Sequence, residues 1–269
     1  MTRFLKLFKA LSAILRQPAL LNKVLDDTDL NKEEVIKKYQ LPRGLKTVEI
    51  MDLLPVLDLE VEPFGAMEGG STPIDLALLK GLASLKSGCH YFEIGTWRGE
   101  SVANVASVAE HCVTLNLPDE HMLKTGMPPS YVALHRFFSQ DLKNVTHLEG
   151  NSLTYDYQSL KNKFDLVFVD GDHHYESVRT DTKNAFTLLK DAHSVIVWHD
   201  YGNDPSDIRW DVLRGILDGT PAEKQKYLYR VSNTLCAIYT EQPLSSRYPD
   251  PFSQPLKHFS VKVSAKKRL

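Results

Sequence analysis

Hydrophobic and polar positions form alternating blocks along the middle of the chain, and these blocks predict strands and helices in turn. Short apolar runs predict strands at 90–94, 112–117, 145–148, 164–169 and 194–198, and helical spacing predicts helices at 101–110, 131–142, 175–190 and 208–217. The runs at 164–169 and 194–198 are apolar at almost every position, so both faces of the sheet must be covered. The pattern predicts a doubly wound α/β fold around a parallel sheet.

An extension with helical periodicity precedes this region. Residues 3–16 place apolar side chains at helical spacing among basic ones, namely Phe4, Phe8, Leu11 and Leu15. This segment predicts a basic amphipathic helix, which either packs on the core or a second subunit, or lies on an anionic membrane surface. Asn31 predicts the capped start of a second helix, and Thr72 with Asp75 predicts the capped start of a third.

The end of the chain has a different pattern. Short β-rich runs at 227–231 and 235–240 predict an antiparallel hairpin rather than another helical crossover. The sequence then becomes rich in Pro and Ser and ends with basic residues, which predicts a loosely attached tail with solvated charges. We therefore expect a helical extension over residues 1–60, a core domain over 61–242 and a C-terminal tail over 243–269.

A glycine loop after the first predicted strand gives the first chemical signal. Gly95 and Gly99 have no Cβ, so the backbone can turn tightly and approach a ligand closely. Their Gly-x-x-x-Gly spacing is not the dinucleotide fingerprint, and no Gly-Lys-Ser/Thr follows to hold a triphosphate. Glu93 at the strand end would repel a phosphate but suits a ligand with an ammonium group. The loop indicates such a ligand, although a glycine turn of this kind is often only structural.

Ionisable side chains gather after two later strands. Asp170, Asp172, His173 and His174 follow the strand at 164–169, and His199 with Asp200 follows the next strand. Asp172 or His173 could simply cap the following helix. A cap does not require so many charged groups, however, and ligands of this fold class lie at the carboxyl ends of the strands. The two strand ends together predict an active site.

These features resemble the class I S-adenosylmethionine-dependent methyltransferases over about residues 65–240. Within that class the chain is similar to small-molecule O-methyltransferases with a strand-borne Asp-Gly-Asp-His-x-Tyr-Glu segment, here residues 170–176, and an Asp-Tyr pair after the next strand, here residues 200–201. The resemblance implies a Rossmann-like, mostly parallel, seven-stranded sheet with a terminal hairpin. It also implies a set of residues around the cofactor, S-adenosylmethionine: Glu93, Gly95, Thr96, Gly99, Ser101, Asn116, Asn151, Ser152 and Asp170.

Two departures from the family pattern affect these expectations. Asn116 stands where an acid usually binds the ribose, and Asn151 with Ser152 stands where an Asp-Ser pair is common near the adenine. Related sugar methyltransferases hold a divalent metal with three Asp residues, and here the corresponding positions are Asp170, His199 and Asp200. We expect a metal at these three residues, with Mg²⁺ as the first candidate, although imidazole suits Zn²⁺, Fe²⁺ or Mn²⁺ better.

Composition indicates which kinds of partner and which compartment to expect. The 32 basic and 34 acidic residues give a formal net charge of −2, so nucleic acid is not an expected partner. No segment approaches the roughly 18 apolar residues of a membrane span, and the N-terminus lacks a secretory pattern, which favours the cytoplasm. The three cysteines have no metal spacing and are expected to be reduced and mostly buried. A small-molecule acceptor is the expected partner, and a homodimer is compatible with the sequence.

Three functional hypotheses remain open at this point. The first is transfer of a methyl group to a hydroxyl of a sugar, phenol or natural product, with Asp172, His173 or His199 removing the proton. The second is a metal-dependent, hydroxylase-like enzyme on the same fold, with His199 and two carboxylates as ligands. The third is a cofactor-binding or scaffold protein with a decayed site.

Overall fold

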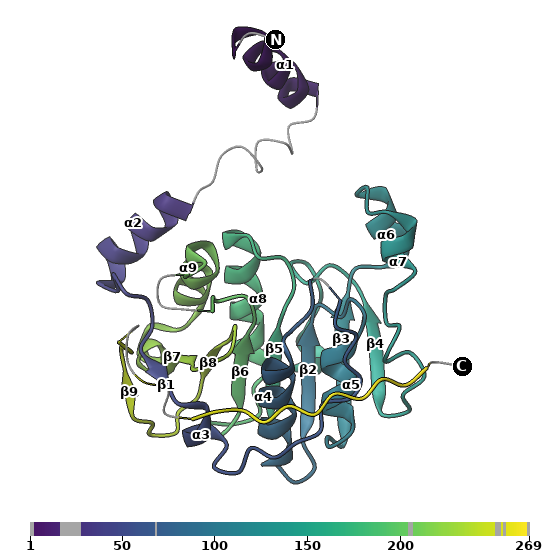
Figure 1. Ribbon diagram of the computed structural model, residues 1–269, viewed down its shortest axis with the longest axis vertical. Helices are drawn as coiled ribbons and strands as arrows, with labels where there is room; N and C mark the ends of the chain where they lie inside the picture. The colour runs from purple at the N-terminus through teal and green to yellow at the C-terminus, as the bar shows by residue number, and fades with distance from the viewer. Residues whose placement is uncertain are drawn as a thin grey trace.

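The strands form one sheet in a computed structural model that describes residues 3–16, 28–67, 69–203, 207–250, 254 and 257–267. Within these residues the sheet has nine strands in the order β4-β3-β2-β5-β6-β8-β7-β1-β9 (Figure 1). Their bounds are β1 Thr47–Val48, β2 His90–Ile94, β3 His111–Asn116, β4 Val145–Glu149, β5 Leu166–Val169, β6 Val195–Trp198, β7 Leu228–Val231, β8 Ala237–Tyr239 and β9 Ser246–Arg247.

The direction of the strands confirms the expected fold class. Strands β2 to β6 pair parallel with one another, and β8 pairs antiparallel with both β6 and β7. The predicted terminal hairpin is therefore confirmed. The seven strands from β4 to β7 form the implied sheet. Two short additional strands extend its edge: β1 precedes the alternating region in the chain, and β9 follows the hairpin.

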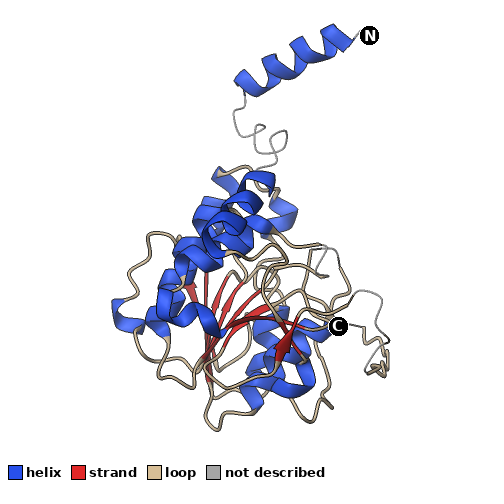
Figure 2. Cartoon of the chain, turned by 90° about the vertical axis from the view of Figure 1, so that its left-hand side faces the viewer, coloured by secondary structure: helices blue, strands red, loops and turns tan. Residues whose placement is uncertain are grey.

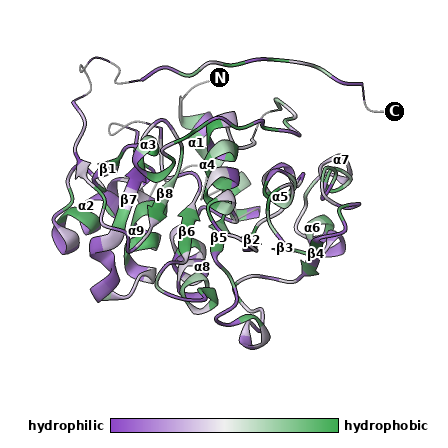
Figure 3. Ribbon diagram, turned by 90° about the horizontal axis from the view of Figure 1, so that it is seen from below, coloured by the Kyte–Doolittle hydropathy of each residue, from purple (hydrophilic) through white to green (hydrophobic). Residues whose placement is uncertain are grey.

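Helices cover both faces of this sheet, as the uniformly apolar strands predict (Figure 2). Tyr91 and Phe168 point to the face where α4 and α5 pack, whereas Phe92 and Val167 point to the face of α8 and α9. Strands β6 and β8 are accordingly hydrophobic in Figure 3. The helices are α1 Arg3–Arg16, α2 Thr28–Tyr39, α3 Ile50–Leu53, α4 Pro73–Ser84, α5 Glu100–Ala106, α6 Asp119–Lys124, α7 Pro129–Val132, α8 Tyr175–Leu188 and α9 Trp210–Gly219, and 3₁₀ turns span Gln158–Leu160 and Ala222–Tyr227.

The start of α4 follows the sequence prediction. Thr72 is the N-cap, and its Oγ1 accepts a hydrogen bond from the Asp75 N–H at 3.2 Å. Asp75 Oδ2 accepts the Thr72 N–H at 2.7 Å, which completes a capping box. The local pattern thus fixes the backbone around Asp75, whose side chain is completely buried.

Three predicted helix boundaries are wrong, one of them that of α5, which ends at Ala106 rather than at 110. Helix α2 begins at Thr28, so Asn31 lies inside it, where its Oδ1 accepts a hydrogen bond from Arg214 of α9 at 2.9 Å. The helix predicted at 131–142 ends at Val132, the last residue of α7. Beyond it, the backbone N–H groups of Arg136 and Phe138 donate to carbonyls at 97 and 98 instead of forming helical bonds.

The two ends of the described chain differ in how they contact the rest. The tail is not merely solvated, because Lys257 pairs with Glu49 and Lys266 Nζ lies 2.7 Å from Glu62 Oε1. Helix α1, in contrast, stands apart from the other helices (Figure 1). Across the part of the chain that the structure describes, no helix is both long and apolar enough to span a membrane. The three cysteines are free and buried, as expected.

Candidate active site

The glycine loop after β2 lies directly against the end of β5. Gly95 has a φ of +91°, and a Cβ at this position would lie 2.0 Å from the carbonyl oxygen of Asp170. The Asp170 N–H in turn donates to the carbonyl of Ile94 at 2.8 Å. A glycine is therefore needed here because the two strand ends are packed together. This contact joins the predicted cofactor loop to the predicted catalytic cluster.

Gly99 is also packed tightly against another segment of the chain. Its φ is +76°, and a Cβ would lie 2.2 Å from Ser139 Oγ. The neighbouring Trp97 ring stacks on Tyr131, with 5.3 Å between the ring centroids and 19° between the planes. Tyr131 of α7 and Ser139 beyond it thus both pack against the loop. The space beside Gly99, expected to hold a ligand, is occupied by Ser139.

Glu93 lies beneath the loop rather than facing solvent. Its carboxylate accepts hydrogen bonds from Tyr91 Oη at 2.5 Å and from Ser101 Oγ at 2.9 Å. Burial raises the pKa of Glu93 to about 8, and the charge of Asp170 acts in the same direction. Glu93 and Ser101 therefore hold the start of α5 to β2, with both carboxylate oxygens already engaged.

The ends of β3 and β4 carry the residues expected near the ribose and adenine. Asn116 Oδ1 accepts the Thr96 N–H at 3.2 Å, and its Nδ2 donates to the carbonyl of Leu117 at 3.1 Å. Asn151 is exposed, and its Oδ1 accepts the Leu153 N–H at 3.0 Å. Both asparagines thus order the backbone at these strand ends.

Asp181 of α8 is a candidate site residue that the sequence does not indicate. Its side chain is 1% exposed, and its Oδ1 has no hydrogen-bond partner among the described residues. Burial raises its pKa to about 7, although a hydrogen bond with Ser152 acts against this. Asp181 lies within a helical pattern that gives no chemical signal. Its unpaired oxygen beside Ser152 could accept a hydrogen bond from an amine.

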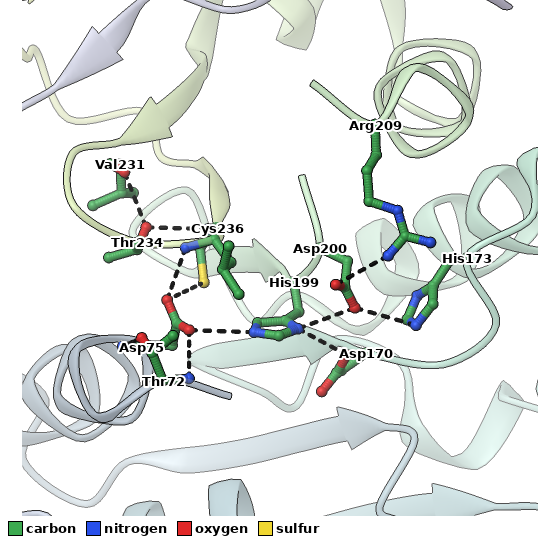
Figure 4. A network of polar contacts seen from close by, with 11 residues as sticks. Thr72, Asp75, Asp170, His173, His199, Asp200, Arg209, Val231, Thr234 and Cys236 are labelled. Carbon is green, nitrogen blue, oxygen red and sulfur yellow. Dashed lines mark hydrogen bonds and ion pairs between the residues drawn. The ribbon is translucent and has the colours of Figure 1, made fainter. Parts of the chain in front are cut away.

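His199 forms the centre of a buried polar network (Figure 4). Its Nε2 lies 3.3 Å from Asp75 Oδ2, and its Nδ1 lies 3.3 Å from Asp170 Oδ1 and 3.2 Å from Asp200 Oδ2. Burial acts to lower the pKa of His199, but Asp170 and the other two carboxylates outweigh it and raise the pKa well above its ordinary value. Both ring nitrogens therefore serve as donors to carboxylates.

Asp75, in the first turn of α4, also belongs to this network. Burial acts to raise its pKa, yet the hydrogen bond with His199 holds the pKa below its ordinary value. Asp75 Oδ1 also accepts the Leu235 N–H at 2.9 Å, just before β8. The sequence marks Asp75 as part of a helix cap, but it gives no signal of the contact with His199.

His173 is less enclosed than His199. Its side chain is 38% exposed, and its Nε2 lies 3.1 Å from Asp200 Oδ2. Asp200 Oδ1 also forms an ion pair with Arg209 Nη1 at 3.0 Å, a partner that the sequence does not indicate. A cavity of about 10 Å³ next to His173 has room for about one water molecule. His173 is therefore the accessible, carboxylate-oriented imidazole of the cluster.

Asp172 has a different position from His173. Its Oδ1 lies 2.5 Å from His174 Nδ1, and its Oδ2 accepts a hydrogen bond from Ser177 Oγ at 2.8 Å. These contacts tie the loop to the first turn of α8. Asp172 is thus occupied in holding the local backbone.

Among the described residues, one group of side chains could hold a metal ion. Ligand atoms of Asp170, His173 and Asp200 all lie within 4.8 Å of one another. This trio contains two of the predicted ligands, Asp170 and Asp200, with His173 added to them. The third predicted ligand, His199, contacts both carboxylates through its Nδ1. Two carboxylates and one imidazole fit Mn²⁺, Fe²⁺ or Zn²⁺ better than they fit Mg²⁺.

Comparison with known proteins points to one family for the central region. Residues 92–201, which include the glycine loop and both charged strand ends, match a family model described as a methyltransferase domain. No curated protein sequence matches the chain at a significant level. The family match therefore covers the predicted site but less than half of the chain.

Solved structures of methyltransferases are similar in fold. An O-methyltransferase from Bacillus cereus in complex with SAH is 18% identical, with a TM-score of 0.41, over 81% of this chain and 93% of that one. The SAH-bound Podospora anserina methyltransferase PaMTH1 is 18% identical, with a TM-score of 0.46, over 67% and 83%. The chain spans about half (52%) of a Bacillus halodurans structure at 18% identity, with a TM-score of 0.36 and 48% of this chain covered.

Proposed function

We propose that this protein is an S-adenosylmethionine-dependent methyltransferase that acts on a hydroxyl of a small molecule. The contact between Gly95 and the Asp170 carbonyl carries the proposal, because it joins the glycine loop to the charged cluster at one edge of the sheet. The family match to a methyltransferase domain spans both parts. Ligands of such folds lie at this edge.

Several residues fit the cofactor. The loop from Gly95 to Gly99 and the ends of β3 and β4 would surround it, and the unpaired Asp181 Oδ1 suits the exocyclic amine of the adenine. Asn116 already donates and accepts within the protein, so it would contribute less to the ribose than an acid would. When bound, the cofactor supplies an electrophilic methyl group on a sulfonium.

His173 is the residue we assign to removal of the acceptor proton. The base must reach the hydroxyl, and His173 is partly exposed beside a water-sized space, whereas His199 is buried between carboxylates. Asp200, itself held by Arg209, would orient His173 and stabilise its protonated form. His199 and Asp75 are then positioning residues that hold Asp170 and Asp200 in place.

The alternative to a general base at His173 is a divalent ion bound by Asp170, His173 and Asp200. Such an ion would supply positive charge that lowers the pKa of a bound hydroxyl. His173 would then be a ligand rather than a base. The acceptor classes stay open between a sugar, a phenol and another natural product, because the described side chains include no group specific to one of them.

The direct test is titration calorimetry of the protein with S-adenosylmethionine and with S-adenosylhomocysteine, followed by a screen of hydroxyl acceptors with methyl-labelled cofactor. We expect dissociation constants in the micromolar range, near physiological ligand levels. Asp181→Asn provides a second readout, since it should weaken cofactor binding without reducing the folded fraction. Asp156→Asn serves as its control, because Asp156 is an exposed residue whose Oδ1 accepts the Gln158 N–H.

Other outcomes would replace the proposal. If neither ligand binds at millimolar concentration, the methyltransferase function is excluded. Bound iron in a protein that does not bind the cofactor would favour a hydroxylase-like enzyme. Absence of metal, cofactor binding and turnover together would favour a scaffold protein.

A further inference from the structure

Helix α1 leaves a continuous apolar face uncovered. Six large apolar side chains of this helix are between 49% and 81% exposed, namely Phe4, Leu5, Leu7, Phe8, Leu11 and Leu15. Figures 1 and 2 both show the helix apart from the sheet and its covering helices. Helix α9, which is also amphipathic, has instead buried Val212, Leu213 and Ile216 in the core. The face of α1 is thus open to a partner outside the described fold.

The charges of α1 are of one sign. Four basic residues and no acidic residue occur between positions 3 and 16, although acids outnumber basic residues in the whole chain. At 100° per residue, Phe4, Phe8, Leu11 and Leu15 lie on one side of the helix, and Lys6, Lys9 and Ala13 lie on the other. Arg3 and Arg16 lie between these two sides, one on each border of the apolar face, and their long stems can extend toward anionic groups while the face is buried.

We propose that α1 binds an anionic lipid surface and lies in the plane of that surface. The helix has 14 residues, so its length of about 21 Å is too short to cross a hydrocarbon core of about 30 Å. An apolar face with flanking cations and no acids is complementary to the negative headgroup layer of a membrane. A second copy of α1 would instead bring eight like charges together. This inference does not depend on the proposed methyltransferase activity.

Vesicle flotation with the full chain tests the proposal. The probes are vesicles of phosphatidylcholine with and without phosphatidylglycerol, at low and high salt. We expect the protein to float with the anionic vesicles and to be released by salt. Phe8→Ser combined with Leu11→Ser should abolish binding, whereas Ala13→Ser, the same kind of change on the opposite side, should leave it intact. Lys6→Glu combined with Lys9→Glu should reduce binding by about tenfold or more.

The flotation results distinguish membrane binding from the alternatives. All variants should retain the wild-type thermal unfolding of the sheet, because α1 stands apart from it. Failure of the wild type to float, or equal flotation of the Phe8→Ser/Leu11→Ser protein, would overturn the proposal. A concentration-dependent dimer that the same double variant dissociates, without flotation, would make α1 a subunit contact instead.

Discussion

The two halves of the candidate site are built in different ways. The loop after β2 is satisfied internally: Gly95 meets the Asp170 carbonyl, Gly99 meets Ser139, and Glu93 holds Ser101. The ends of β5 and β6 instead concentrate charges around His199, and His173 remains partly exposed. Packing explains the residue types of the loop, but it does not explain the number of ionisable groups in the cluster. This difference is what the proposed function predicts of a loop that shapes the site and a cluster that carries its chemistry.

Removing His173 should have the largest effect. If His173 is the general base, His173→Ala lowers kcat by about 10²–10⁴ while the protein stays folded. His174→Ala is the matched control, because His174 is more exposed and contacts only the loop residue Asp172 among the ionisable groups. Its rate should stay within a few-fold of the wild type. Both are measured as single-turnover methyl transfer.

A chelator separates the two roles of His173. If turnover survives chelation, His173 acts as a base. If chelation stops turnover and His173→Ala lowers the metal content, His173 is a ligand and the assignment as base is wrong.

Glu93 should make stability depend on pH. Its folded pKa of about 8 lies above the ordinary value of 4.5, so the folded state binds the proton more tightly than the unfolded state. The stabilisation is present in full below pH 4.5 and is lost as the pH rises to about 8. A shift of this size corresponds to about 4–5 kcal/mol. Glu93→Gln should remove this loss, as measured by denaturant unfolding between pH 5 and 9.

The contrary result would change the view of the loop. If Glu93→Gln has the same pH dependence as the wild type, the carboxylate is already ionised when the protein is folded. Glu93 would then carry a charge available to a cationic ligand, as the sequence suggested. Ser177→Ala is a useful control, since it removes a hydrogen bond of Asp172 in the exposed loop at the start of α8 without affecting Glu93.

Gly95 tests whether the two halves depend on each other. Gly95→Ala places a methyl group against the Asp170 carbonyl in a left-handed backbone conformation, and should cost about 3–4 kcal/mol of unfolding free energy. Gly126→Ala has the same backbone strain, with a φ of +90°, but its Cβ meets nothing within 4 Å. It should cost only about 1–2 kcal/mol. Equal costs for the two variants would show that the strand ends separate easily.

These cases also show what the sequence can predict. Strand β2, the capped start of α4 and the terminal hairpin were predicted because their signals are local: an apolar run, a capping pair and a change of period. The parallel order of the strands then brings Asp170 and His199 to one edge. The approximate site therefore follows from local patterns plus one rule of topology.

The errors arise where a partner is distant in the chain. The helix predicted at 131–142 is interrupted because amides of Arg136 and Phe138 donate to the glycine loop about 40 residues earlier. Asp75 lies 124 positions from His199, so its second role is not visible in the pattern around α4. Asp181 and Arg209 were missed for the same reason. Local patterns place the elements, and contacts between elements decide which side chains are free to react.

The smallest predicted effect concerns the cap of α4. Thr72→Ala removes the side-chain acceptor of the Asp75 N–H and should cost about 1 kcal/mol of unfolding free energy. Ser84→Ala, at the other end of the helix, removes only a bond to the Lys80 carbonyl and should change stability less. The rate of Thr72→Ala should stay unchanged, because the Asp75 carboxylate keeps its contacts with His199 and the N–H groups of Thr72 and Leu235. A loss of rate in Thr72→Ala without a matching loss in Ser84→Ala would mean that the cap itself sets the position of His199. The charged cluster would then depend on local structure as closely as the glycine loop does.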